Sequence, residues 1–250
     1  YASRGLKMRF TSGTGSEVGR AAVIITAEGR KLGIVSPHML PSVALCDPEL
    51  TYGLPAFLTA ATGMDALSHC LETYMAPSIN PPADAIALDG LKRGFPAIRR
   101  VVSDGKDKAG RFDMMMAALE GAMAFQKGLG AIHALSHPVG ALYDTHHGMT
   151  NAVFMPYVLA VNRPAIEARI ARLAAYIGLE PTFDAFMAAV LDLRAKLAVP
   201  HTLKDFKVDG AQRDKIGDMA IVDPTAGGNP VELTKALALE IFDRAMDGRF

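Results

Sequence analysis

The 250-residue sequence has few cysteines, no excess of either charge and no hydrophobic run long enough to cross a bilayer. Its two cysteines, Cys46 and Cys70, are too few for a disulfide framework, which predicts a reducing, cytoplasmic location. The 26 Lys and Arg residues balance the 26 Asp and Glu residues, which argues against binding to nucleic acid or to an anionic membrane surface. The longest apolar run, residues 152–161, is too short for a transmembrane helix and contains Pro156.

What the sequence does contain is material for a large core. Half of its residues are hydrophobic and its mean hydropathy is +0.19. Strand-like patterns occur only near the start: a hairpin over residues 21–37 with its turn at 27–29, and a short strand of buried type at 42–46. The segment before Thr11 lacks an apolar strand pattern. From Pro55 onward the pattern is helical almost throughout, so we expect a mainly α fold.

Within the helical part, three features predict helix boundaries. Pro55 suits a first helical position. Residues 62–65 have the form of a capping box, which would open the helix that contains His69. Gly94 and Pro96 predict a kink or a break in the helix that starts near residue 83.

Four of the seven histidines lie between Gly128 and Asn151. His133 and His137 are four residues apart and therefore share one face of a helix. His147 follows after a segment that can turn the chain back, and Gly148 would let the backbone come close to whatever His147 holds. Asp65 and His69 repeat the four-residue spacing upstream.

Three imidazoles and one carboxylate predict a site for a divalent metal ion. The alternative for Asp65 is a carboxylate that caps a helix start, and the alternative for His69 is an ordinary core histidine. The residues by themselves leave both alternatives open.

The stretch TSGTGSEVG, residues 11–19, alternates glycines with hydroxyl residues. Such a stretch can form a tight loop whose backbone N–H groups face an anion. The alternative is a capping box made by Thr14 and Glu17. A capping box should precede a helix, whereas the strand-like AAVIIT follows here.

Several motifs in this order resemble the iron-containing (group III) alcohol dehydrogenase family. They are TSGTGSEV (11–18), DPELT (47–51), TGMDALSHCLETY (62–74), GLGAIHALSHPVGALYDTHHGMTNAVFMPYVL (128–159) and GGNPVELT (227–234). The resemblance implies an α/β dinucleotide-binding half, an all-helical metal-binding half and an active site between them. It divides this chain into a remnant of the first half (residues 1–53) and the helical domain (residues 54–250). The family's Gly/Ser-rich pyrophosphate loop is not found before Thr11, so we expect the sequence to be part of a longer protein.

Carried over residue by residue, the resemblance also implies a site. The metal ligands would be Asp65, His69, His133 and His147, with Fe²⁺ or Zn²⁺ as the ion. His137 would be the additional histidine beside the metal and the nicotinamide, with a catalytic role as a proton relay or a supporting role for the ligands. The residues that contact NAD or NADP would be Thr11, Thr14, Lys31 and Leu50. His146 stands where many members have proline, and no role is assigned to it.

The implied activity is hydride transfer between NAD(P) and the carbon of a small alcohol or aldehyde, in a homodimer or larger homo-oligomer. One alternative within the family is a ketoacid reductase similar to maleylacetate reductase, which need not depend on iron. Another is a metal-dependent lyase similar to dehydroquinate synthase. A third is a non-catalytic fragment that binds metal but lacks its cofactor half.

Overall fold

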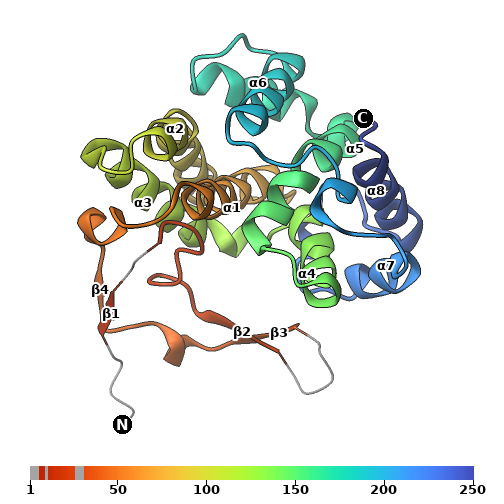
Figure 1. Cartoon of the computed structure of the whole chain (residues 1–250), viewed down its shortest axis with the longest axis horizontal. Coiled ribbons are helices and arrows are strands. Elements are labelled where there is room, and N and C mark those ends of the chain that lie inside the picture. The colour runs from red at the N-terminus through yellow and green to blue at the C-terminus, as the bar shows by residue number, and fades with distance from the viewer. Residues whose placement is uncertain (1–5, 9–10, 26–30) are drawn as a thin grey trace.

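The computed structural model of the chain describes residues 6–8, 11–25 and 31–250, and it is mainly α, as the sequence predicts (Figure 1). The α-helices of this described part are α1 (Ala56–Met75), α2 (Pro81–Ser103), α3 (Lys108–Met123), α4 (Ala131–Tyr143), α5 (His147–Tyr176), α6 (Phe183–Lys196), α7 (Arg213–Ile221) and α8 (Lys235–Asp247). Within the same ranges, none of them has both the length and the apolar character that crossing a membrane requires.

The strands of the described residues precede α1 in the sequence and form two small two-stranded sheets beside the helices (Figure 1). β2 (Ala21–Ile25) and β3 (Lys31–Val35) pair antiparallel, which confirms the expected hairpin; its predicted turn at 27–29 lies outside the described residues. β1 (Leu6–Met8) pairs in parallel with β4 (Val43–Leu45). Two expectations were therefore wrong: a strand does form before Thr11, and the strand predicted as buried is exposed along its whole length.

Helix α1 lies at the centre of the helical part and packs against α2, α3 and α5 (Figure 1). From Thr59 to its end nearly every residue is buried, as expected for a helix that neighbours enclose on all sides. Asp65, His69 and Glu72 are therefore polar groups in the core, and each must find a partner there or cost free energy.

One predicted helix start was wrong, and of the kink or break predicted near Gly94 the break does not occur. The supposed capping box at residues 62–65 lies inside α1, where the Thr62 hydroxyl donates to the Leu58 carbonyl oxygen over 2.8 Å. Helix α2 is assigned without a break through Gly94 and Pro96. A Cβ added at Gly94 would lie 2.9 Å from Ala117 Cβ on α3, so close helix packing, and not a break, accounts for this glycine.

Where α2 meets α3, one guanidinium is surrounded by three carboxylates. Arg93 Nε lies 2.6 Å from Asp89 Oδ2 and 3.6 Å from Glu120 Oε1, and another Arg93 nitrogen lies 3.6 Å from Asp113. Burial, together with the charge of Asp89, raises the pKa of Glu120 to about 7. The folded protein therefore holds a proton on Glu120 over a pH range in which the unfolded chain has already released it.

This difference predicts how stability depends on pH. Because the folded state binds the extra proton between about pH 4.5 and pH 7, the contribution of Glu120 to the free energy of unfolding should fall as the pH rises through that range, by about 1–3 kcal/mol. Glu120→Gln should remove this decline and stabilise the protein at pH 8. Urea unfolding of both proteins at pH 5 and pH 8 tests this, with the surface variant Glu167→Gln as the control. Equal pH dependence in wild type and Glu120→Gln would contradict the prediction.

Candidate metal centre

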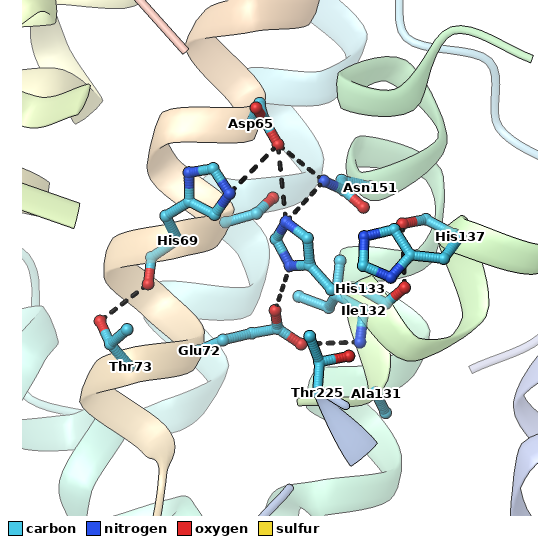
Figure 2. A network of polar contacts seen from close by, with 12 residues as sticks. Asp65, His69, Glu72, Thr73, Ala131, Ile132, His133, His137, Asn151 and Thr225 are labelled. Carbon is cyan, nitrogen blue, oxygen red and sulfur yellow. Dashed lines mark hydrogen bonds and ion pairs between the residues drawn. The ribbon is translucent and has the colours of Figure 1, made fainter. Parts of the chain in front are cut away.

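One face of α1 presents three ionisable side chains toward α4. Asp65, His69 and Glu72 follow one another at spacings of four and three residues, and each is at least 95% buried. The spacing places them along one side of the helix, as Figure 2 shows. The residues between them are buried in the core around α1. One helix therefore both packs in the core and carries the ionisable side chains of the centre.

Helix α4 is positioned at its start by groups from elsewhere in the fold. Its N-cap is Gly130, which has no side chain to satisfy the first N–H groups of the helix. Instead, Ala131 N donates to Asn229 Oδ1 over 3.2 Å, and Ile132 N donates to Glu72 Oε1 over 2.7 Å. Two side chains from outside α4 thus satisfy its first N–H groups, and one of them, Glu72, also reaches a histidine of that helix.

Helix α5 begins at His147, the third predicted imidazole ligand. Gly148 follows it, and a Cβ added there would lie 2.1 Å from the Ala61 carbonyl oxygen and 3.1 Å from Asp65 Cβ. The glycine therefore allows α5 to start against α1, and the close approach expected at Gly148 is to the helix that carries Asp65. One turn later, Asn151 is fully buried in the same place.

The structure brings the four predicted ligands together around one oxygen atom. Asp65 Oδ1 lies 3.6 Å from His69 Nε2, 3.6 Å from His133 Nε2 and 3.5 Å from His147 Nε2 (Figure 2 shows the first two contacts). One ligand atom each from Asp65, His133 and His147 falls within 4.8 Å of the others. The His69 and His133 rings stack with their centroids 4.7 Å apart.

The charges in this cluster differ from residue to residue. Burial raises the pKa of Asp65, but the His69 and His147 imidazoles outweigh it and hold that pKa far below its usual range. Burial lowers the pKa of His69 to about 4 and that of His147 to about 3, so both rings are neutral at pH 7. Burial also disfavours the charged form of His133, but Glu72 and Asp65 outweigh burial and raise its pKa to about 9. The His69 and His147 rings thus offer lone pairs near neutral pH, whereas His133 holds an extra proton that an ion bound at its Nε2 would displace.

These residues fit a divalent ion. Donors about 2.0–2.2 Å from a tetrahedral ion lie about 3.3–3.6 Å from one another, and the three distances from Asp65 Oδ1 are close to this range. Neutral imidazoles offer lone pairs, and a nitrogen-rich set with one carboxylate suits Fe²⁺ or Zn²⁺. Side-chain exposure rises from 2% at His133 to 33% at His147, so the centre opens on the His147 side.

Asn151 is a further polar residue at this centre. Its Nδ2 donates to Asp65 Oδ1 over 2.8 Å and lies 3.1 Å from His133 Nε2 and 3.2 Å from His147 Nε2. An amide nitrogen has two N–H groups, so it cannot serve all three atoms. The Asn151 carbonyl oxygen is buried and has no hydrogen-bond partner among the described residues.

His137 lies beside the centre, with its ring stacked on that of His147 at 5.3 Å. Its Nδ1 lies 2.8 Å from Asp223 Oδ2. The other oxygen of Asp223 accepts hydrogen bonds from the Thr225 hydroxyl and backbone N–H, so both carboxylate oxygens have partners. Because a carboxylate accepts at Nδ1, the Nε2 of His137 is the nitrogen left free for other contacts.

The predicted cofactor residues lie on the N-terminal part of the chain. Thr11 and Leu50 are half-buried and Thr14 is exposed. Lys31 is the first residue of β3, and its side chain is not among those that the structure describes. Their contact with a nicotinamide cofactor stays a prediction.

The glycines of the loop over residues 11–20 have a structural role. Gly15 has φ +60°, and a Cβ added there would lie 2.2 Å from the Ala118 carbonyl oxygen on α3. The loop is thus packed onto a helix, and β2 follows it at Ala21. The capping-box interpretation of Thr14 and Glu17 was wrong because no helix begins there.

Sequence reasoning missed Glu72, Asn151 and Asp223. For the first two a signal was available, since Glu72 continues the helical spacing of Asp65 and His69, and Asn151 follows His147 by one turn. For Asp223 there was none, because it lies 86 residues from His137 and only the fold brings the two together.

Comparison with known proteins identifies the class to which this fold and site belong. The model of the Fe-containing alcohol dehydrogenase family, C-terminal, matches residues 59–246, and that of iron-containing alcohol dehydrogenase matches residues 10–48. The chain therefore belongs to the iron-containing alcohol dehydrogenase family.

Particular relatives are similar over nearly the whole chain. The 4-hydroxybutyrate dehydrogenase of Cupriavidus necator is 49% identical over 245 residues, which cover 94% of this chain and 64% of the relative. The 1,3-propanediol dehydrogenase of Klebsiella pneumoniae is 38% identical over 244 residues, covering 94% of this chain and 63% of that protein. The chain thus spans slightly less than two thirds of the length of these curated relatives.

Solved structures agree with the fold. A crystal structure of 1,3-propanediol oxidoreductase matches with a TM-score of 0.90 and 34% identity over 98% of this chain and 70% of that one. The sulfoacetaldehyde reductase of Bifidobacterium kashiwanohense, solved in complex with NAD+, matches with a TM-score of 0.88 and 30% identity, over 96% of this chain and 64% of that one.

Proposed function

We propose that this chain forms the metal-binding part of an NAD(P)-linked alcohol dehydrogenase that also reduces aldehydes. The observation that carries the proposal is the convergence of Asp65, His69, His133 and His147 around one oxygen atom, from three helices of a chain that belongs to this family. These four residues would hold Fe²⁺ or Zn²⁺. When bound, such an ion acts as a Lewis acid toward the oxygen of an alcohol or carbonyl substrate.

The residues around the centre would decide from which side the substrate and the cofactor approach the ion. His69 and His133 close the buried side of the centre, while His147 and His137 lie on its more open side, with side chains 33% and 21% exposed. A substrate would therefore approach past His137 and His147. The cofactor would enter from the N-terminal part, where Thr11, Thr14, Lys31 and Leu50 lie.

We propose His137 as the residue that exchanges a proton with the substrate oxygen. Its Nδ1 is engaged by Asp223, so its Nε2 is available for that exchange. The alternative is that His137 only supports the neighbouring ligand His147, on which its ring stacks.

The names of the relatives suggest which substrates to try. They are enzymes of 4-hydroxybutyrate and 1,3-propanediol, both short chains with a terminal hydroxyl group. We propose a short primary alcohol that carries a second polar group, and the corresponding aldehyde in the reverse direction.

Metal analysis and steady-state assays of the intact protein test the proposed function. We expect about one Fe or Zn ion per chain, and NADH or NADPH oxidation with succinic semialdehyde or 3-hydroxypropanal that is lost after chelation and restored by the ion. His137→Ala should keep the ion but lose reductase activity by about 10²–10⁴-fold. An unchanged rate and pH profile in this variant would assign His137 to the supporting role.

Three results would contradict the proposal. Metal without turnover in the intact protein would indicate a non-catalytic metal-binding protein. Reductase activity that survives complete removal of metal would indicate a metal-independent ketoacid reductase. NAD that is required but not consumed would indicate a lyase.

A further inference from the structure

Glu72 is a buried carboxylate that lies behind the proposed metal ligands, and its two oxygens have different partners. Oε2 lies 2.5 Å from His133 Nδ1, and Oε1 accepts the Ile132 backbone N–H over 2.7 Å (Figure 2). Its side chain is 1% exposed, so water does not compete for either oxygen. The same side chain thus contacts both a proposed ligand and the start of the helix that carries it.

We propose that Glu72 is a positioning residue of the metal centre, which keeps the proton of His133 on Nδ1 and so leaves Nε2 free for the ion. The inference rests on the proposed metal site and adds a residue to it. An ionised carboxylate only accepts hydrogen bonds, so the ring nitrogen that faces it must be the N–H donor. An imidazole with its proton on Nδ1 presents its lone pair at Nε2, which is the atom 3.6 Å from Asp65 Oδ1.

A second consequence concerns the direction of the ring. Because Oε1 holds the first turn of α4 and Oε2 holds the imidazole, the ring cannot rotate away without breaking a buried hydrogen bond. Carboxylates in this position behind a ligating histidine typically change metal affinity by 10–100-fold when they are altered.

Glu72→Gln separates the two contacts. The glutamine oxygen can still accept the Ile132 N–H, but its NH₂ group then faces His133 Nδ1 and forces that nitrogen to accept. The proton must move to Nε2, the nitrogen proposed to bind the ion. We expect the variant to fold and its affinity for Zn²⁺ and Co²⁺ to fall about 10–100-fold in competition titrations with a chelator.

Asn229→Ala is the matched control. It removes the other external cap of α4, the contact of Asn229 Oδ1 with Ala131 N, but Asn229 has no recorded contact with a histidine in the described structure. Its affinity for Zn²⁺ should stay within about threefold of wild type. Equal losses in both variants would show that Glu72 acts only through the helix start and would overturn the proposal, as would wild-type affinity in Glu72→Gln.

A measurement on the wild-type protein needs no variant. In the Zn²⁺-loaded protein, long-range ¹H–¹⁵N spectra should show His133 protonated at Nδ1 and metal-bound at Nε2. The opposite assignment would overturn the inference even if Glu72→Gln fails to fold. If the wild type binds neither Zn²⁺ nor Co²⁺, the proposed metal site itself is wrong. If the wild type binds the ion and Glu72→Gln binds it with the same affinity, only the role of Glu72 is refuted.

Discussion

Asp65→Asn is expected to reduce Zn²⁺ affinity by about 10²–10³-fold or more and to abolish alcohol and aldehyde turnover. Asp65 is the carboxylate at the middle of the centre, with three imidazole nitrogens 3.5–3.6 Å from Oδ1. The substitution keeps the shape of the side chain but removes its charge. A neutral amide oxygen then replaces the one anionic ligand, and three imidazoles with an amide bind a divalent ion far less tightly.

Metal content, affinity and activity should be measured together in this experiment. Asp184→Asn is a suitable control, because this exposed carboxylate pairs only with Arg163 among the contacts recorded in the described chain. It should retain wild-type metal content and rate. Stoichiometric, tightly held metal in Asp65→Asn would show that Asp65 is a buried structural residue and would remove it from the ligand set.

Gly148→Ala is expected to destabilise the protein by about 2–4 kcal/mol and to lower its metal affinity at least about tenfold. The added Cβ would lie 2.1 Å from the Ala61 carbonyl oxygen, so α5 must move away from α1. His147 opens α5 and Asp65 lies on α1, and the movement therefore separates two proposed ligands. Helix propensity alone predicts the opposite sign, because alanine stabilises a helix by about 1 kcal/mol relative to glycine.

Thermal unfolding of the metal-free protein tests the first part, with an expected decrease in Tm of about 5–15 °C. Zinc titration tests the second part. Gly53→Ala serves as the control, since a Cβ at that position meets nothing within 4 Å among the described atoms. A Gly148→Ala protein as stable as wild type would show that α5 can shift without cost and that the close approach is not required.

Particular residues show which features of the fold and the site could be predicted from the sequence. The spacings Asp65–His69 and His133–His137 depend only on helix geometry, so they were sufficient to predict that each pair shares one face of a helix. The choice of metal ligands among these residues came from the family resemblance. The assignment of Thr62–Asp65 to a helix start failed because a capping motif has the same letters inside a helix, and α1 already begins at Ala56. The exposure of β4 was missed for a related reason, since the pattern of a strand does not show whether a neighbouring layer covers it.

By itself, the sequence determined that the fold is mainly α and which family the chain resembles, and that resemblance implied four metal ligands. The mainly α fold follows from residue type and periodicity and the resemblance from the order of several motifs, which are all properties of short segments. Tertiary structure decided that Glu72 faces His133, that Asp223 faces His137 and that Asn151 lies among the ligands. Contacts across 18 to 86 residues arise from the packing of α1, α4 and α5 and from the loop after α7, and no periodicity within one segment specifies them.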